Sequence, residues 1–366
     1  MRNPFTPSFG QVPPLMAGRE VILADMQHAF DEGPGDPNLC TIFTGARGTG
    51  KTALLLDLSA EAEQRGWIAV NATAIPGMLE DVLEQALRKG AHLLEKQGSV
   101  RLTGVTFARA LGLQWEYAAA APGNWRSRMT DVLEKLHEHG VGLLVTVDEV
   151  DPELDEMIEL SAVYQHFVGE GRKVSLLMAG LPHKVSRLLG HQTVSFLRRA
   201  CQHRLNAVSD ADVRRALRGT VELSEKAIGD KALDAAVSSI GGFPFMMQLV
   251  GFRFWQAAGD ERTVSLEHVQ QGVERAREDM GERVLRPTLD ELSAADLEFL
   301  VAMLADDRVS EASELVERLG KSSGHVSTYK RRLLEHGVID ASPRGTFSFA
   351  LPMLREYLPV YLEESL

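Results

Sequence analysis

A glycine-rich loop between two segments of different periodicity constrains this chain more than any other feature. Before the loop, Leu39–Thr44 is an apolar, β-prone run that predicts a buried strand. After it, Ala53–Arg65 carries apolar residues at helical spacing. A strand that passes through a short loop into a helix is the unit of α/β folds with parallel sheets. The loop consists of Gly45, Ala46, Arg47, Gly48, Thr49, Gly50, Lys51 and Thr52.

The spacing Gly-x-x-x-x-Gly-Lys-Thr in this loop is typical of loops that hold phosphate groups. Glycines let the backbone curl so that successive N–H groups point at phosphate oxygens, and the positive end of the following helix adds attraction. Lys51 would neutralise the β- and γ-phosphates, and Thr52 would be a ligand of Mg²⁺, with Ala53 in the adjoining helical turn. The sequence therefore predicts a site for ATP or ADP with Mg²⁺, the alternative being a glycine-rich turn without a ligand.

Two acidic residues follow a second apolar run. Val141–Val147 predicts a buried strand, and Asp148 and Glu149 come directly after it. Carboxylates at this position are costly to bury unless they serve a ligand at the carboxyl end of the strand, where open α/β sheets bind ligands. Asp148 would hold the Mg²⁺ shell, and Glu149 would orient or deprotonate the attacking water. The alternative is a solvated acidic turn.

Further strands and helices alternate over the first 208 residues. Trp67–Asn71, Lys173–Ala179 and His203–Val208 predict strands, with amphipathic helices between most of them. We therefore expect an α/β core, residues 1–208, with a parallel sheet covered on both faces. The segment 97–124 interrupts this rhythm and receives no assignment.

Helical periodicity dominates from about Ser209 onward. We expect a small helical lid over residues 209–286, and Pro287 predicts a break before a third block, residues 287–366. The helical patterns of the lid are Asp210–Leu217, Ser224–Ser239, Phe245–Ala258 and Ser265–Met280.

The third block has the helix lengths and short joints of a helix-turn-helix. Its helical patterns, which are Ala294–Leu304, Glu311–Leu319 and Ser322–His336, precede an alternating run, Arg344–Ala350, that would form a β-wing. Short polar residues at the start of the third helix suit phosphates and base edges of double-stranded DNA, and basic residues suit its backbone. The alternative is a protein-binding module in which the basic residues are a solvated helical face. The DNA candidates are Ser323, His325, Ser327, Thr328, Lys330, Arg331, Arg332 and Arg344.

Composition narrows these possibilities. The net charge of −12 disfavours nucleic-acid binding through bulk electrostatics, so any DNA contact must rest on a local patch. No apolar run approaches the ~20 residues of a membrane span, and the N-terminus lacks a secretory h-region, so we expect a cytoplasmic protein without a membrane partner. Cys40 and Cys201 are the only cysteines and provide neither a disulfide framework nor a zinc site of ordinary spacing.

Together these motifs resemble the AAA+ and STAND-type P-loop ATPases, especially archaeal and bacterial relatives of the origin-recognition replication initiators. The resemblance implies a C-terminal winged helix and covers nearly the whole chain. The box Ala17-Gly18-Arg19-Glu20 implies that Arg19 lies near adenine and ribose, although a surface Arg at a helix start is an alternative. In the lid, Gly241-Gly242-Phe243-Pro244-Phe245 is similar to the Gly-x-Pro motif of STAND ATPases, which would put Pro244 near the base, whereas a plain helix start is the alternative.

The expected function is an ATP-binding, slowly hydrolysing ATPase that acts as a nucleotide-gated switch and binds or assembles on DNA. Hydrolysis is expected to be slow because no polar residue ends the run Leu176–Gly180, where many such ATPases sense the γ-phosphate. Arg198 or Arg199 could reach a neighbouring subunit's nucleotide as an arginine finger, or both could be surface residues of a helix. The alternative function is a signalling or adaptor ATPase whose winged helix binds a protein partner.

Overall fold

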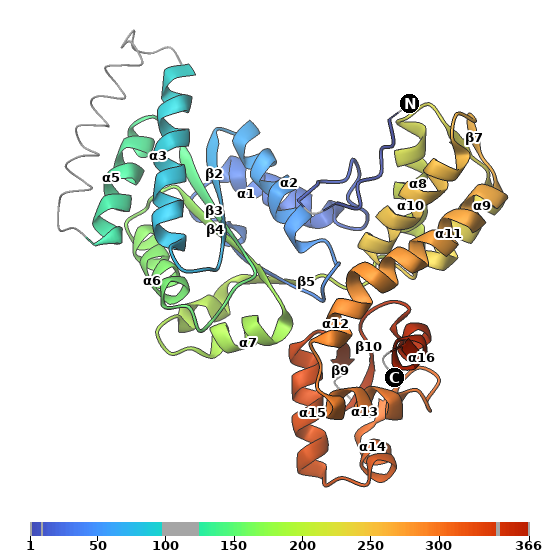
Figure 1. Ribbon diagram of the computed structural model, residues 1–366. Coiled ribbons are helices and arrows are strands. Elements are labelled where there is room, and N and C mark those ends of the chain that lie inside the picture. The colour runs from blue at the N-terminus through green and yellow to red at the C-terminus, as the bar shows by residue number, and fades with distance from the viewer. Residues whose placement is uncertain (1, 9, 97–123, 342–344, 365–366) are drawn as a thin grey trace.

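The computed structural model describes residues 2–8, 10–96, 124–341 and 345–364 (Figure 1). Most of the unassigned segment 97–124 lies outside the described residues. No helix in the described ranges is both long enough and apolar enough to cross a membrane.

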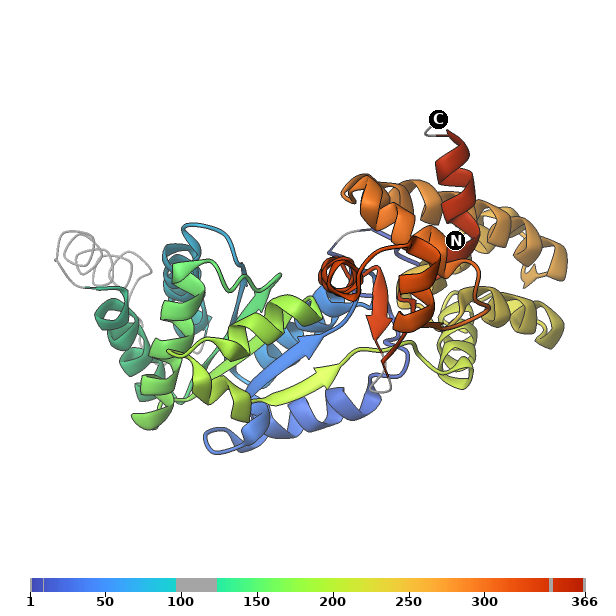
Figure 2. The same cartoon turned by 90° about the horizontal axis from the view of Figure 1, so that it is seen from below.

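A five-stranded parallel sheet forms the centre of the N-terminal part, which confirms the expected α/β core. Its order is β2-β3-β4-β1-β5, so the chain places β1 between the two strands that come last along the sequence. Figure 2 shows that the carboxyl ends of the strands point toward the helices that follow the core. The strands are β1 (Cys40–Thr44), β2 (Trp67–Thr73), β3 (Gly142–Asp148), β4 (Val174–Gly180) and β5 (Cys201–Arg204).

Helices cover both faces of this sheet because alternate strand residues point to opposite sides. Phe43, Leu144 and Leu177 pack on one face against α1 (Glu20–Glu32) and α2 (Lys51–Gln64). The opposite residues of the same strands pack under the remaining helices, which are α3 (Met78–Lys96), α5 (Trp125–Glu138), α6 (Asp155–Gly169) and α7 (Pro182–Gly190).

The last strand of the core lies earlier than predicted. We expected His203–Val208, but β5 ends at Arg204 and follows the 3₁₀ turn η2 (Ser195–Arg199). Leu205 still donates its N–H to Thr44 O (2.6 Å), whereas Val208 donates to Gly242 O (2.7 Å) in the lid. Leu205 therefore extends the contact with the sheet, and Val208 belongs to the junction between core and lid.

The lid contains four helices, as expected, but one expected helix is interrupted. Residues 224–229, predicted to be helical, include the short strand β6 (Ala227–Ile228), which pairs in parallel with β7 (Thr263–Val264). Lys226 is buried there because its ammonium group donates to Gly259 O (2.6 Å) and lies 4.5 Å from the Trp255 ring. The lid helices are α8 (Asp210–Glu222), α9 (Asp230–Ile240), α10 (Pro244–Ala258) and α11 (Leu266–Met280).

Pro287 does not break the chain, contrary to the prediction. Helix α11 continues through the π-helical turn η3 (Gly281–Leu285) into α12 (Arg286–Asp290), whose first turn contains this proline. A proline lacks an N–H and clashes with the carbonyl four residues earlier. The π-helical turn just before Pro287 is wider than an α-helical turn, so the helix continues without this clash.

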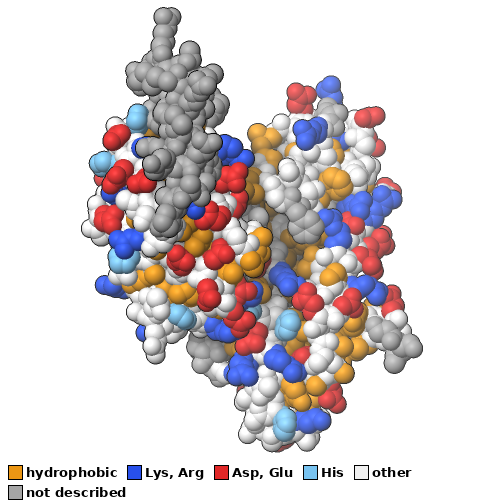
Figure 3. All heavy atoms as spheres, turned by 60° about the vertical axis from the view of Figure 1, so that its left-hand side comes forward, with side chains coloured by type: hydrophobic (Ala, Val, Ile, Leu, Met, Phe, Trp, Pro, Cys, Tyr) orange, Lys and Arg blue, Asp and Glu red, His pale blue; other side chains and the backbone are white. Residues whose placement is uncertain are grey.

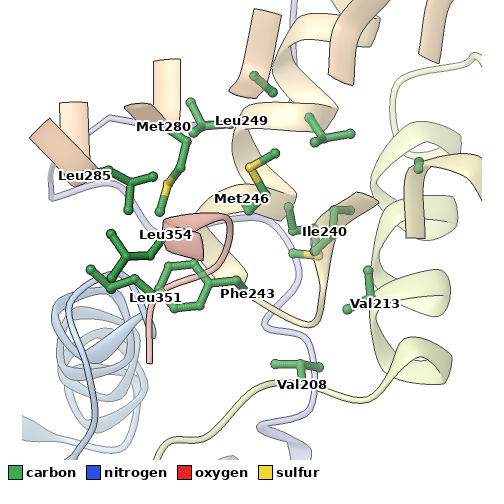
Figure 4. Packing of buried hydrophobic residues seen from close by; sticks show 14 of the residues in the cluster. Val208, Val213, Ile240, Phe243, Met246, Leu249, Met280, Leu285, Leu351 and Leu354 are labelled. Atoms are coloured by element: carbon green, nitrogen blue, oxygen red, sulfur yellow. The ribbon is translucent and has the colours of Figure 1, made fainter. Parts of the chain in front are cut away.

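The C-terminal block contains the three predicted helices and a three-stranded antiparallel sheet. Of the three strands, only the one at Thr346–Phe349 was predicted; the other two strands and the last helix were not. Residues Leu351 and Leu354 pack against Phe243, Met246 and Leu285, so lid and C-terminal block share one hydrophobic cluster (Figure 4). The predicted boundary at 286/287 therefore falls within a continuous helix and a shared core. The elements are α13 (Ala294–Met303), β8 (Ser310–Glu311), α14 (Ala312–Leu319), α15 (Ser323–Glu335), β9 (Ile339–Ala341), β10 (Thr346–Phe349) and α16 (Leu354–Glu364), with sheet order β8-β10-β9.

Candidate functional site

The glycine-rich loop curls around the side chain of Lys51. This side chain is only 6% exposed, and its Nζ donates to Gly45 O and Ala46 O, both at 3.1 Å. Gly48 and Gly50 have φ angles of 78° and 89°, which favour glycine over residues with a Cβ. Burial lowers the pKa of Lys51, opposed by the charges of Glu149 and Asp148. The loop therefore presents a fixed cation at the N-terminus of α2, where the helix dipole also favours an anion.

The acidic pair at the end of β3 lies directly beside this loop. Thr52 Oγ1 donates to Asp148 Oδ2 at 2.5 Å. Hydroxyl and carboxylate oxygens are the ligands that Mg²⁺ prefers, and Mg²⁺ commonly takes one or two protein ligands together with phosphate oxygens. The described ranges contain no cluster of three or more His, Cys, Asp or Glu side chains that could hold a metal ion. The two oxygens thus fit an ion shared with a bound phosphate.

Glu149 has a backbone conformation that few residues with a side chain adopt. Its φ is 54°, and its N–H donates to Asp148 Oδ1 (2.9 Å). Positive φ at a residue other than glycine is uncommon, and such conformations concentrate at functional sites. The turn brings Glu149 to the wall of a cavity that also contains the loop.

That cavity has a volume of about 470 Å³ and lies between core, lid and N-terminal arm. Figure 3 shows the molecule hollowed between two lobes, with hydrophobic side chains along the hollow. The loop residues 47–52 line the cavity together with Ala53, Arg19 and Pro244. The cavity thus joins the predicted base-side residues to the predicted phosphate-side residues.

Arg19 at the start of α1 and Pro244 at the start of the lid helix α10 both lie beside the loop. The guanidinium of Arg19 donates to Asn206 O (3.2 Å) and Thr49 O (3.5 Å), and burial lowers its pKa. On the lid side, a Cβ built on Gly50 would lie 3.9 Å from Pro244 Cβ. Both residues therefore belong to the cavity walls as well as to the ends of their helices.

Three further residues that line the cavity were not predicted. These are Thr6 of the N-terminal arm, Gln248 on α10 and Arg283 in the π-helical turn. Thr6 is more than 240 positions from the other two in the sequence, so they meet through tertiary structure. Only the position of Gln248 one helical turn after Pro244 could have suggested a shared face.

Arg198 and Arg199 do not line the cavity. Both are exposed in η2, and Arg198 Nε donates to Leu189 O (2.8 Å). Within one chain, these arginines lie on the surface of the core.

The DNA candidates on α15 fall into two groups. Four are exposed at the start of the helix, namely Ser323, His325, Ser327 and Thr328. The basic residues that follow mostly have partners within the chain: Lys330 Nζ lies 4.8 Å from the Phe347 ring, and Arg332 Nη2 donates to Asp296 Oδ1 (2.6 Å). Arg331 is the most exposed, with 71% of its side chain accessible and Glu335 at 3.9 Å. Arg344 lies outside the described residues.

The C-terminal block also contacts the phosphate loop itself. The Arg47 guanidinium donates to both carboxylate oxygens of Glu291 (3.4 and 3.3 Å), and His336 lies 3.9 Å from the same carboxylate. A second ion pair joins Arg204 at the end of β5 to Asp340 (2.6 Å). The block is therefore fastened to the core beside the cavity.

Comparisons with known proteins agree with this architecture. The family model described as Domain of unknown function (DUF8462) matches residues 282–358. Among curated proteins, none matches this sequence. The fold is similar to that of a Walker-type ATPase of Pyrococcus abyssi, at 14% identity over 94% of this chain and 96% of that chain, with a TM-score of 0.66. It is also similar to the Aeropyrum pernix ORC2 protein in its ADPNP–ADP complexes, at 15% identity over 98% and 97% of the two chains, with a TM-score of 0.52.

At these identities the likeness concerns the fold. This chain has an ORC-like P-loop NTPase fold, in agreement with the fold that the sequence predicted.

Proposed function

We propose that this chain, which has an ORC-like AAA+ fold, binds ATP and ADP with Mg²⁺ and hydrolyses ATP slowly. One observation carries the proposal: Thr52 Oγ1 and Asp148 Oδ2 lie 2.5 Å apart beside the buried ammonium group of Lys51. A cation and two hard oxygen ligands at a helix N-terminus match the needs of a Mg²⁺-bound phosphate chain. The substrate would be ATP and water, and the products ADP and phosphate.

Each side chain has a role in this proposal. Lys51 would neutralise the β- and γ-phosphates, and Thr52 and Asp148 would hold Mg²⁺, which would offset the negative charge of the phosphates. Glu149, turned toward the cavity, orients or deprotonates the attacking water. Arg19 and Pro244 border the nucleoside.

Slow turnover is part of the proposal because the end of β4 offers no γ-phosphate sensor. The strand ends in Ala179 and Gly180, and its only hydroxyl, on Ser175, is buried and donates to Leu39 O (2.9 Å). Fast phosphoryl transfer generally needs several groups that stabilise transition-state charge.

Calorimetry on folded protein freed of nucleotide tests binding, and phosphate release tests turnover. We expect Mg²⁺-dependent binding of ATP and ADP, and at least 10-fold slower phosphate release by Glu149→Gln with binding retained. Glu153→Gln, an equivalent change at an exposed carboxylate of the next turn, is the matched control. Absence of Mg²⁺-dependent binding by the wild type would refute the proposal.

We further propose that nucleotide gates the C-terminal block. Arg47 belongs to the phosphate loop yet pairs with Glu291 of the block, so phosphate groups and Glu291 would compete for one guanidinium. The shared hydrophobic cluster would keep lid and block together while the core moves against them. Binding of phosphate would thus weaken one of the ion pairs that join the core to the C-terminal block.

The output of this switch is proposed to be DNA binding through a winged helix. Three helices followed by the β9-β10 hairpin suit such a module, and the exposed start of α15 suits base edges. The partners of Arg332 and Lys330 favour the second candidate, a block that binds a protein. A mobility assay with duplex DNA, in ADP and in a non-hydrolysable ATP analogue, distinguishes them: DNA binding predicts a nucleotide-dependent shift, and a protein-binding module predicts none.

An arginine finger requires a second subunit. Arg198 and Arg199 are exposed and would be available to a neighbouring copy of this chain. Mass measurement of the native assembly with and without ATP tests this role. A monomer under both conditions would remove it.

A further inference from the structure

The N-terminal arm is fastened to the lid along one wall of the cavity. Phe5 is 2% exposed and packs edge-on against Phe254, with ring centroids 5.3 Å apart. A Cβ on Gly251 would overlap the Phe5 ring, so this glycine makes room for it. The arm then crosses from the lid to the core ahead of α1 (Figure 1). Two further hydrogen bonds fix it: Asn3 Nδ2 to Phe252 O (3.0 Å) and Arg283 Nη2 to Pro7 O (2.8 Å).

Gln248 is the polar residue of α10 at this wall. It is 7% exposed and lines the cavity, and its Oε1 accepts the backbone N–H of Thr6 (3.0 Å). Because that N–H can only donate, the amide oxygen of Gln248 must face it. The two hydrogens of the Gln248 amide nitrogen then have no acceptor among residues 2–8, 10–96, 124–341 and 345–364. Because the Gln248 side chain lines the cavity, these hydrogens can reach a molecule bound there.

The position of Gln248 relative to the phosphate loop indicates what it would meet. Helix α10 begins at Pro244 beside Gly50, and Phe245 N–H donates to Gly48 O (3.3 Å). Gln248 lies four residues after Pro244, on the same helical face and about 6 Å farther from the loop. A nucleotide with its phosphates on the loop would extend its nucleoside in this direction along the cavity.

We propose that Gln248, oriented by Thr6, is a base-recognition residue that donates a hydrogen bond to a ring-nitrogen acceptor of a bound purine nucleotide. The N–H of Thr6 fixes the amide so that it can only donate toward the cavity. The apolar neighbours Met16, Pro244 and Phe245 suit the faces of the heterocycle. This inference rests on the proposed function, because it concerns the nucleoside end of the same site.

The test compares ATP with tripolyphosphate, which has the phosphates but no nucleoside. Gln248→Glu keeps the length and the acceptor for Thr6 but replaces the donor by a second acceptor. We expect about 10-fold weaker Mg·ATP binding and an unchanged affinity for Mg·tripolyphosphate. Gln256→Glu, the same change two turns later at an exposed position, should bind both as the wild type does.

Deaza analogues of ADP give a second measurement, and a purely structural role of Gln248 would not affect its result. Replacing one ring nitrogen of ADP by C–H, at position 1, 3 or 7, removes one acceptor at a time. Wild type should lose affinity for one of the three, and Gln248→Met should bind that analogue and ADP equally well.

Four results would overturn the inference. Unchanged ATP binding by Gln248→Glu removes the donor role, and a parallel loss of ATP and tripolyphosphate binding means that the residue supports the loop instead. Equal affinity of the wild type for tripolyphosphate and ATP also refutes base recognition while leaving the proposed phosphate site intact. Failure of the wild type to bind either ligand refutes both proposals.

Discussion

The phosphate loop and helix α15 both carry predicted ligand-binding residues, but the structure uses the two sets differently. Lys51, Thr52 and Asp148 meet beside one cavity, and the ammonium of Lys51 is held by carbonyls of its own loop. On α15, Arg332 pairs with Asp296, and Lys330 lies over Phe347. Loop geometry depends on a few consecutive residues, whereas long basic side chains on a helix find partners that sequence spacing does not reveal.

The largest effect is expected at the loop. Lys51→Ala removes the buried ammonium from the phosphates, and loss of charge-assisted hydrogen bonds should weaken ATP binding about 100-fold. Calorimetry with Mg·ATP measures the change. Lys231→Ala, at an exposed lysine of α9, is the control and should bind as the wild type does. Similar affinities of both variants would mean that the loop is a glycine-rich turn without a ligand.

The sequence predicted the parallel sheet and the loop because their determinants are local. Apolar runs define β1, β3 and β4, and the glycines that need positive φ are next to the lysine that they surround. Asp148 could be placed beside Thr52 because the carboxyl ends of parallel strands share one edge of a sheet.

The predictions that failed depended on tertiary context. The effect of Pro287 depends on the π turn before it, which no local rule indicated. Leu205 and Val208 follow β5, but only Leu205 still bonds to the sheet, whereas Val208 donates to Gly242 O in the lid. The role of Gln248 requires Thr6, which lies 242 positions away. Such pairings follow from packing and are not visible in spacing.

Arg332 and Arg331 on α15 are expected to differ in how much each contributes to the stability of the fold. Asp296 has only 4% of its side chain exposed, so Arg332→Ala leaves a buried carboxylate without its cation and should cost about 2 kcal/mol of unfolding free energy. Arg331→Ala removes a side chain that is 71% exposed and should change stability by less than about 0.5 kcal/mol. Urea unfolding measures both. Equal costs would contradict a structural role for Arg332.

A smaller effect is expected where the C-terminal block contacts the phosphate loop. Glu291→Gln frees Arg47 from its ion pair, so the guanidinium no longer has to exchange a carboxylate for a phosphate. Because both side chains are nearly half exposed, the pair is worth less than about 1 kcal/mol, and ADP affinity should rise two- to five-fold. Glu298→Gln, an exposed carboxylate on α13, serves as the control. A fall in affinity would mean that Glu291 supports the loop instead of competing with the ligand.

The smallest effect concerns DNA itself. If α15 contacts duplex DNA, Arg331 is its most available basic residue, and Arg331→Ala should weaken binding about two- to three-fold and reduce the salt dependence by about one counterion. Filter binding across a salt series measures both quantities, with Arg275→Ala on the exposed face of α11 as the matched control. Arg332→Ala does not substitute for this test, because its effect on the fold would lower DNA binding whatever surface makes the contact. An unchanged salt slope for Arg331→Ala would favour a protein partner for the block, since the remaining basic residues predicted on α15 are engaged within the chain.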